Sequence, residues 1–141
     1  MTTPTELEIQ NATKVLDLLC QIDGVAFEQQ EARKDIFIVS EPDTGLQCVI
    51  DVEEDVVVSF IEICELPNGK LPVGLSDKLL ELNDAAVYGA FTINSGKLYF
   101  KSNLAVENLD LNELEGSIRS VFYTVHTSLG VIATYFNQGE N

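Results

Sequence analysis

The spacing of apolar residues changes along this chain from every second residue to every third or fourth, and this change limits the folds open to it. Between Val25 and Cys64 the period is two, which predicts four strands with the sequences VAFEQQ, DIFIVS, LQCVIDV and VVVSFIEIC. Between Leu114 and Phe136 apolar residues recur every three or four positions, which predicts one long helix. The chain therefore has to combine a sheet with helices.

Turn residues separate the four strands and predict that they are antiparallel neighbours. The segments 42–45 (PDTG) and 53–55 (EED) both have the composition of hairpin turns. DIFIVS and VVVSFIEIC are apolar on both faces, so they are central strands or present a second apolar face to something else. LQCVIDV instead has one apolar face, as expected for a half-buried strand, made of Leu46, Cys48, Ile50 and Val52.

Three helices are expected. The segment 3–6 (TPTE) supplies an N-cap, a proline at the first helical position and a glutamate, and predicts a helix that runs to about Ile22. Asp110 and Glu113 form a capping-box pattern at the start of the long helix. Ser76 is expected to cap a short helix, SDKLLELND, whose inward residues are Leu79, Leu80 and Leu82.

The segment from Ala86 to Leu104 reads as two strands joined by a tight turn at Ser95 and Gly96. Gly89 is expected there for backbone reasons, and the packing residues are Phe91, Ile93, Leu98 and Phe100. The full order predicts an α+β fold, with an antiparallel sheet of about five to six strands, terminal helices packed on one face, and a short helix between the strand groups. Residues 1–141 are expected to form a single domain.

The charge of the chain narrows its possible partners. Twenty-three acidic and eight basic residues give a net charge of −15, so we expect neither nucleic-acid binding nor a membrane partner. The start, MTTPTELEIQ, lacks the basic and apolar regions of a secretory signal, which predicts a cytoplasmic protein. Cys20, Cys48 and Cys64 each lie in an apolar pattern and are expected to be small core residues in a reducing compartment.

No sequence pattern points to catalysis or to a cofactor. The chain has no GxSxG, HExxH, GxGxxG or GxxxxGKS motif, and its single histidine, His126, is expected to serve packing or the surface of the long helix. We therefore expect a protein that is not an enzyme, with no cofactor, and we assign no residue as a metal ligand.

An acidic hairpin lies between Glu41 and Glu65, where eight carboxylates occur without a lysine or arginine. A solvated edge, a contact for a basic partner and a Ca²⁺ or Mg²⁺ site are all open readings of this segment. The candidate acidic contact surface consists of Asp51, Glu53, Glu54 and Asp55.

The long helix carries no charged residue between Arg119 and Glu140. Small neutral side chains on its second face, where a solvated helix would show Glu and Lys, permit close approach of another surface. We expect a second subunit, a partner or the chain itself to cover this face. The candidate partner or dimer surface consists of Ser120, Tyr123, Thr124, Thr127, Val131 and Thr134, with Ser128 and Gly130 beside them.

The run from Leu79 to Phe122 resembles the YbjN-like family of bacterial proteins. The residues that carry the resemblance are Leu79, Leu80, Leu82 and Asn83 at a helix end, Gly89 and Phe91 in a strand, Lys101 in the next strand, and Leu109 with Asp110 before the last helix. The resemblance implies a fold similar to the type III secretion chaperones, which are small, acidic, cytoplasmic and commonly dimeric proteins that bind other proteins. It implies no catalytic residues.

The sequence thus predicts a non-catalytic protein-interaction module, chaperone-like or regulatory, that acts as a homodimer and offers an apolar strand or helix surface to a protein partner of unknown identity. The alternative is a small-molecule or divalent-metal-binding module that uses the acidic hairpin 41–65.

Overall fold

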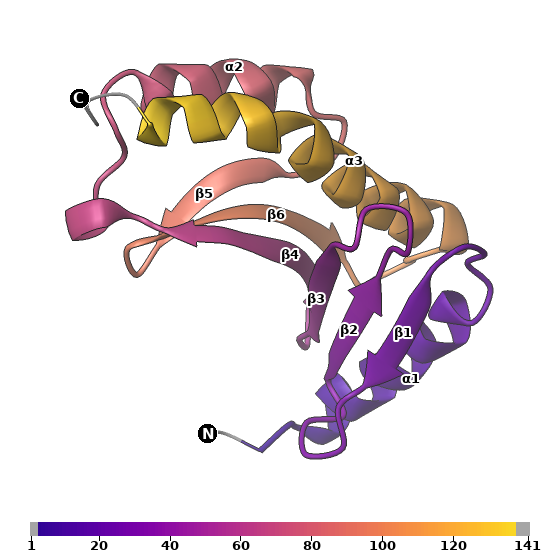
Figure 1. Cartoon of the computed structure of the whole chain (residues 1–141). Helices are drawn as coiled ribbons and strands as arrows, with labels where there is room; N and C mark the ends of the chain where they lie inside the picture. Colours follow the sequence, from indigo (N-terminus) through magenta and orange to yellow (C-terminus); the bar gives the residue numbers. More distant parts are fainter. Residues whose placement is uncertain (1–2, 138–141) are drawn as a thin grey trace.

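A computed structural model describes residues 3–137 and shows one six-stranded antiparallel sheet with three α-helices (Figure 1). The strand order is β1-β2-β3-β4-β6-β5, so β1 and β5 are the two edges. The strands are β1 (Ala26–Gln29), β2 (Ile36–Ser40), β3 (Gln47–Val52), β4 (Val56–Glu65), β5 (Ala90–Asn94) and β6 (Lys97–Ala105). The helices are α1 (Glu6–Leu19), α2 (Leu75–Ala85), α3 (Leu111–Phe136) and the short 3₁₀ helix η1 (Pro67–Gly69).

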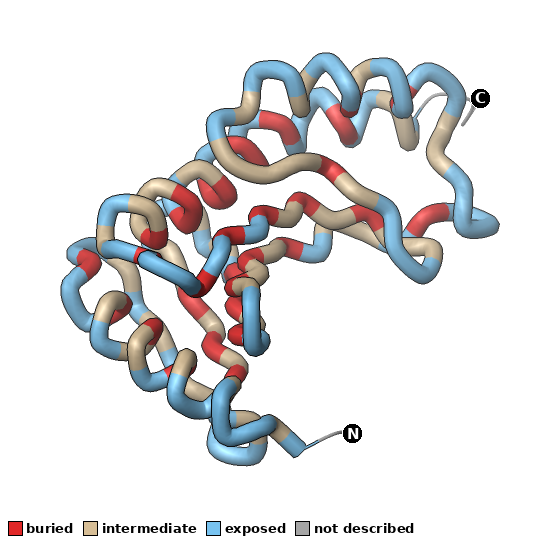
Figure 2. The backbone as a smooth tube through the Cα atoms, turned by 180° about the vertical axis from the view of Figure 1, so that it is seen from behind, coloured by how far each residue is buried: buried red, intermediate tan, exposed pale blue. Residues whose placement is uncertain are grey.

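All three α-helices lie on one face of the sheet (Figure 1). The sheet is curved, and its concave side is the face without helices (Figure 1). The buried segments follow the strands and the inward sides of the helices (Figure 2). The core holds the helix-facing side chains of the strands, such as Phe37, Ile50 and Phe100, together with Leu114 and Ile118 of α3. The predicted α+β fold, with a six-stranded antiparallel sheet and terminal helices on one face, is confirmed.

The first helix is shifted and shortened relative to the prediction. Its N-cap is Thr5, and Glu8 completes the capping box, whereas the sequence placed the cap at Thr3. The helix ends at Leu19 and not at about Ile22, since Gln21 and Ile22 bond to carbonyls three residues back. The expected limit was wrong because those residues form a tight turn that still buries Ile22.

The second helix starts earlier than predicted. Gly74, with φ of +85°, is the N-cap and makes no side-chain capping bond, so the assignment of Ser76 as cap was wrong. Ser76 instead lies within the first turn and is exposed. Leu79 is buried and Leu82 is partly buried, but Leu80 is 68% exposed and does not face inward as expected. Only one side of α2 reaches the core.

The third helix has its predicted N-cap, Asp110, but the Glu113 side chain makes no return bond to the cap backbone, so the predicted capping box forms only in part. The Asp110 side chain accepts a 2.8 Å hydrogen bond from the backbone N–H of Glu113, and thus satisfies one free donor of the first turn. The expected stripe is buried from Leu114 to Val125 and again at Ile132. Leu129 and Ala133 are exposed, and they line a hollow between the end of α3 and the end of β4, together with Ile63 and Cys64.

The predicted hairpin forms with its turn at Ser95 and Gly96, which have φ of +52° and +75°. Its first strand begins at Ala90 and not at Ala86, because Ala86 is the C-cap of α2. Phe91 and Phe100 pack edge to face at 4.9 Å, but Ile93 is half-exposed instead of packed. Gly89 has φ of +86°, and a Cβ there would lie 2.7 Å from the carbonyl oxygen of Lys101. This position therefore requires glycine.

The three cysteines differ in environment. Cys48 is buried, as expected, and burial raises the pKa of its thiol to about 12. Cys64 is partly buried, and Cys20 is exposed. The prediction that Cys20 is a core residue was wrong, since α1 ends one residue before it and turns it toward solvent.

Candidate interaction surfaces

The sheet face away from the helices is uncovered, and we call it the open face. Alternate residues of each strand point to it, because neighbouring side chains of a strand point to opposite sides. Its apolar members come from the strands nearest the middle of the sheet and are Ile36, Ile38, Val49, Val56, Val58, Phe60 and Tyr99. All seven are partly exposed, which is unusual for so many apolar side chains on one face.

The open face explains why two predicted strands were apolar on both sides. In β2, Phe37 and Val39 enter the core while Ile36 and Ile38 lie on the open face. β4 alternates in the same way over its first half, and there Phe60 packs edge to face against Tyr99 of β6, with ring centroids 5.7 Å apart. Both strands are central and also present a second apolar face.

Charged side chains lie at intervals on this face. Asp51 of β3 points to it, and partial burial raises the pKa of its carboxyl, with further contributions from the negative charges of Glu53 and Asp35. Lys97 and Glu62 form an ion pair of 3.3 Å that raises the pKa of Lys97. Glu62 and Lys97 thus neutralise each other on the β4–β6 side, whereas Asp51 takes part in no ion pair within residues 3–137.

The predicted acidic contact surface divides into two parts. Glu53, Glu54 and Asp55 form the exposed turn between β3 and β4, whereas Asp51 lies on the open face. The amide of Asn11 in α1 donates to the carbonyl oxygens of Glu53 and Glu54 at 3.0 and 2.9 Å, which ties this turn to the first helix. Within residues 3–137 there is no group of three or more His, Cys, Asp or Glu that could hold a metal ion.

The predicted neutral face of α3 is covered in part by the chain itself. Ser120 exchanges 3.3 Å hydrogen bonds with the backbone N–H and C=O of Tyr88, which precedes β5. Thr124 and Ser128 are buried. The remaining candidates are exposed and form a narrower strip, made of Tyr123, Thr127, Val131 and Thr134.

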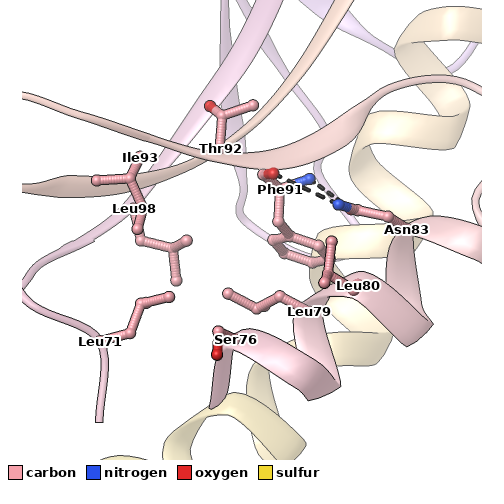
Figure 3. Close-up of a pocket in the computed structure, with 9 residues that line it drawn as sticks. All are labelled: Leu71, Ser76, Leu79, Leu80, Asn83, Phe91, Thr92, Ile93 and Leu98. Atoms are coloured by element: carbon pink, nitrogen blue, oxygen red, sulfur yellow. Dashed lines mark hydrogen bonds between the residues drawn. The ribbon is translucent and has the colours of Figure 1, made fainter. Parts of the chain in front are cut away.

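A groove lies between α2 and the edge strand β5 (Figure 3). Its volume is about 260 Å³, and its apolar lining includes Leu71, Leu79, Leu80, Phe91, Ile93 and Leu98. The Asn83 side chain accepts a 2.6 Å hydrogen bond from the backbone N–H of Phe91, which holds the end of α2 against β5. Leu80 and Ile93 extend the groove to an exposed apolar rim.

Sequence reasoning missed two sets of residues. It did not single out Glu28, Val49, Tyr99 and Lys101 as members of one face, although the period of two could have assigned each of them a side. It also counted Leu80 and Ile93 as packing residues. The signal for Leu80 was a surplus, since α2 carries more apolar residues than one inward face can hold. Ile93 shares the helix-facing side of β5 with Phe91, and its exposure on the edge strand had no signal in the sequence.

The surroundings of the histidine and the character of the helices complete the description of the surface. His126, the one histidine, is exposed on α3. In the described part of the chain, no helix combines the length and the apolar character needed to cross a membrane.

Comparison with known proteins places this arrangement in a family. No curated protein matches the chain. Among solved structures it is similar to a chain of the heterodimeric complex ExoU-SpcU from the type III secretion system of Pseudomonas aeruginosa, with a TM-score of 0.59 and 16% sequence identity. That likeness covers 74% of this chain and 88% of the other, and shows the fold alone. The CesT_Tir_1 family profile matches residues 8–137, so the chain belongs to this family of type III secretion chaperones.

Proposed function

We propose that this protein is a non-catalytic chaperone that binds an apolar segment of a partner protein on its open face. The observation that carries the proposal is the set of seven partly exposed apolar side chains on a face that no element of residues 3–137 covers. A face of this kind is typical of a protein-binding site, because its burial by a partner removes apolar surface from water. The family and the fold support a chaperone role.

The proposal includes a cytoplasmic location and a single domain over residues 1–141. It also includes the narrower resemblance to YbjN-like proteins. Two of the residues that carry this resemblance, Asn83 and Phe91, are joined by a hydrogen bond, and Gly89 lies where a side chain would collide with β6. These contacts give a structural reason for the motif.

We test partner binding by placing a photo-cross-linking benzoylphenylalanine at Tyr99, where an aromatic side chain already lies on the open face. His126, exposed on the opposite side of the molecule on α3, is the matched control position. Irradiation in the native host should give a discrete adduct with another protein from position 99 and none from position 126. Adding Phe60→Ser should remove the adduct while the fold is retained.

Equal adducts from both positions, or an adduct that survives Phe60→Ser, would contradict binding at the open face. Washing the complex at low and high salt before irradiation separates the forces involved. Retention at high salt indicates apolar contact, and loss indicates that the acidic turn at residues 53–55 contributes.

The same proposal includes a homodimer, formed through the groove between α2 and β5. Leu80 is 68%, Val87 84% and Ile93 49% exposed around this groove, and β5 has one unpaired edge. An edge strand beside apolar side chains is stabilised when a second copy covers both, and a two-fold axis lets the same patch meet itself. The exposed strip of α3 is the competing surface, and its Thr127 and Thr134 hydroxyls already donate to carbonyls of their own helix.

Measurement of mass in solution distinguishes the two surfaces. The pair Leu80→Glu and Ile93→Lys should convert the dimer to a folded monomer, while Thr127→Glu with Thr134→Glu should leave the mass unchanged. The reverse result would assign the dimer to α3. A monomeric parent protein at all concentrations would exclude the homodimer.

A further inference from the structure

One row of the open face crosses the sheet from edge to edge. The strand register places Glu28 opposite Ile38, Ile38 opposite Val49, Val49 opposite Phe60, and Phe60 opposite Lys101. The row ends at Ala90 of the edge strand β5, which has no charge to add. It therefore carries a carboxylate on β1, three apolar side chains on β2, β3 and β4, and an ammonium on β6.

The two end charges are available to a partner. In the range 3–137 neither Glu28 nor Lys101 takes part in an ion pair, whereas Glu62 and Lys97 on the same face neutralise each other. Asp51 lies on β3, two residues from Val49, and adds a second carboxylate on the β1–β3 side. The row thus has a carboxylate at its β1 end and an ammonium at its β6 end, while Glu65, opposite Lys97 at the end of β4, adds a carboxylate outside the row.

A hollow lies beside each end of the row. One, of about 180 Å³, is lined by Glu28 and Ile38 together with Ala26, Phe27, Ser40 and Gln47. The other, of about 140 Å³, is lined by Phe60 and Lys101 together with Thr92, Asn94 and Tyr99. Each charge therefore has space next to it for a side chain of opposite charge and its apolar stem.

Strand pairing within the sheet limits the conformation of a peptide segment that binds between these hollows. The backbone groups of β2, β3, β4 and β6 are taken up by pairing on both sides, so a segment that lies over them gains no backbone partner. A buried backbone must then satisfy its own hydrogen bonds, which an α-helix does and an extended segment does not. From β1 to β6 there are four strand spacings of about 4.8 Å, or about 19 Å along the sheet, and the curl of the sheet shortens the direct span (Figure 1). A helix of up to about 13 residues is therefore long enough to reach from one end of the row to the other.

We propose, on the basis of the proposed function, that the open face binds an amphipathic α-helix of a partner protein in one direction. The helix lies across the strands with its N-terminal end over Glu28 and Asp51 and its C-terminal end over Lys101. Its apolar stripe contacts Ile38, Val49 and Phe60. Basic residues lie at its N-terminal end and acidic residues at its C-terminal end, so side-chain charge and helix dipole favour the same direction.

Two synthetic helical peptides of about 14 residues test the direction. Both carry leucines at helical spacing; one has lysines at its N-terminal end and glutamates at its C-terminal end, and the other has these charged ends exchanged. Calorimetric titration at low salt should show the first peptide binding about fivefold or more tightly, as expected for exposed charge pairs. Salt at high concentration should remove this difference.

Exchange of the protein charges provides the decisive control. In the variant with Glu28→Lys and Lys101→Glu the preference should shift toward the second peptide. Because the same two peptides are used with both proteins, any difference in the helicity of the free peptides cancels in this comparison. A charge exchange away from the open face, Lys70→Glu with Glu107→Lys, keeps the same net charge and should leave the original preference. Both positions are exposed outside the sheet.

The outcomes separate this inference from the proposed function. If both peptides bind equally to the parent protein and Phe60→Ser abolishes binding, the open face binds segments but the direction is wrong. If neither peptide binds, or Phe60→Ser leaves binding intact, both proposals fail. A parent dimer that becomes monomeric through the Glu28 and Lys101 exchange would assign the face to a second copy of this chain and overturn the inference.

Discussion

Ser117 on α3 donates a 2.8 Å hydrogen bond to Ser102 on β6, and both side chains are buried. Small residues at this contact let the long helix lie close to the centre of the sheet, and the hydrogen bond satisfies the two hydroxyls that would otherwise face an apolar core. The contact lies on the helix-covered side of the sheet, opposite the open face.

Ser59 is the cross-strand neighbour of Ser102 but has no hydrogen-bond partner for its buried hydroxyl within the described residues. An unsatisfied buried hydroxyl opposes folding, so Ser59→Ala should raise the free energy of unfolding by about 1 kcal/mol. Ser102→Ala should lower it by about 1–2 kcal/mol, because it leaves the Ser117 hydroxyl unpaired. Urea unfolding of the three proteins measures both changes, and a loss of stability in Ser59→Ala would contradict the assignment.

Gly89→Ala should destabilise the protein strongly. The new Cβ would lie 2.7 Å from the carbonyl oxygen of Lys101 and 2.8 Å from the Phe100 ring, at a φ of +86°. We expect a loss of about 2 kcal/mol or more. Gly130→Ala is the matched control: apart from its chain neighbours and the backbone of its own helix, no atom lies within 4 Å of the added Cβ, and alanine in a helix should add up to about 1 kcal/mol. Thermal melting separates these opposite signs.

The sequence predicted the fold well because its signals are local. The turns at residues 42–45 and 53–55 separate strands whose period is two, and the cap at Asp110 marks the start of α3. The start of α2 was misplaced because a glycine with positive φ, Gly74, ends the preceding loop and lets the helix begin without a polar cap. Such a start has no side chain that a sequence pattern can recognise.

The candidate site was predicted less well, for a different physical reason. Periodicity assigns Phe60 and Lys101 to a face, but only the pairing of β4 with β6 makes them neighbours. That pairing skips β5, and joins segments about forty residues apart, so no local pattern contains it. The charge row from Glu28 to Lys101 runs through three hairpin registers between consecutive strands and through this one long-range register, so its basic end can be placed only in the folded sheet.

The cysteines should differ in their rates of alkylation by iodoacetamide. The thiolate is the reactive form, so an exposed thiol reacts readily and a buried thiol with a raised pKa reacts slowly. We expect Cys20 to react first, Cys64 more slowly because burial and then Glu62 raise its pKa, and Cys48 only after unfolding. Peptide mass spectrometry over time gives the order. In guanidinium chloride all three rates should become similar, and fast labelling of Cys48 without denaturant would contradict its burial.

Asp51 should make stability depend on pH through its position on the open face. Burial, followed by Glu53 and Asp35, raises the pKa of Asp51 above its usual value of 3.8. The folded protein therefore binds this proton more tightly than the unfolded chain, so the ionised carboxylate opposes folding above the raised pKa, and the opposition fades as pH falls toward 3.8. Asp51→Asn should raise the Tm at neutral pH, and its advantage should shrink on acidification. Asp43→Asn, at an exposed turn position, should change the Tm little at any pH. An Asp51→Asn advantage that grows as pH falls would show that the carboxylate stabilises the open face.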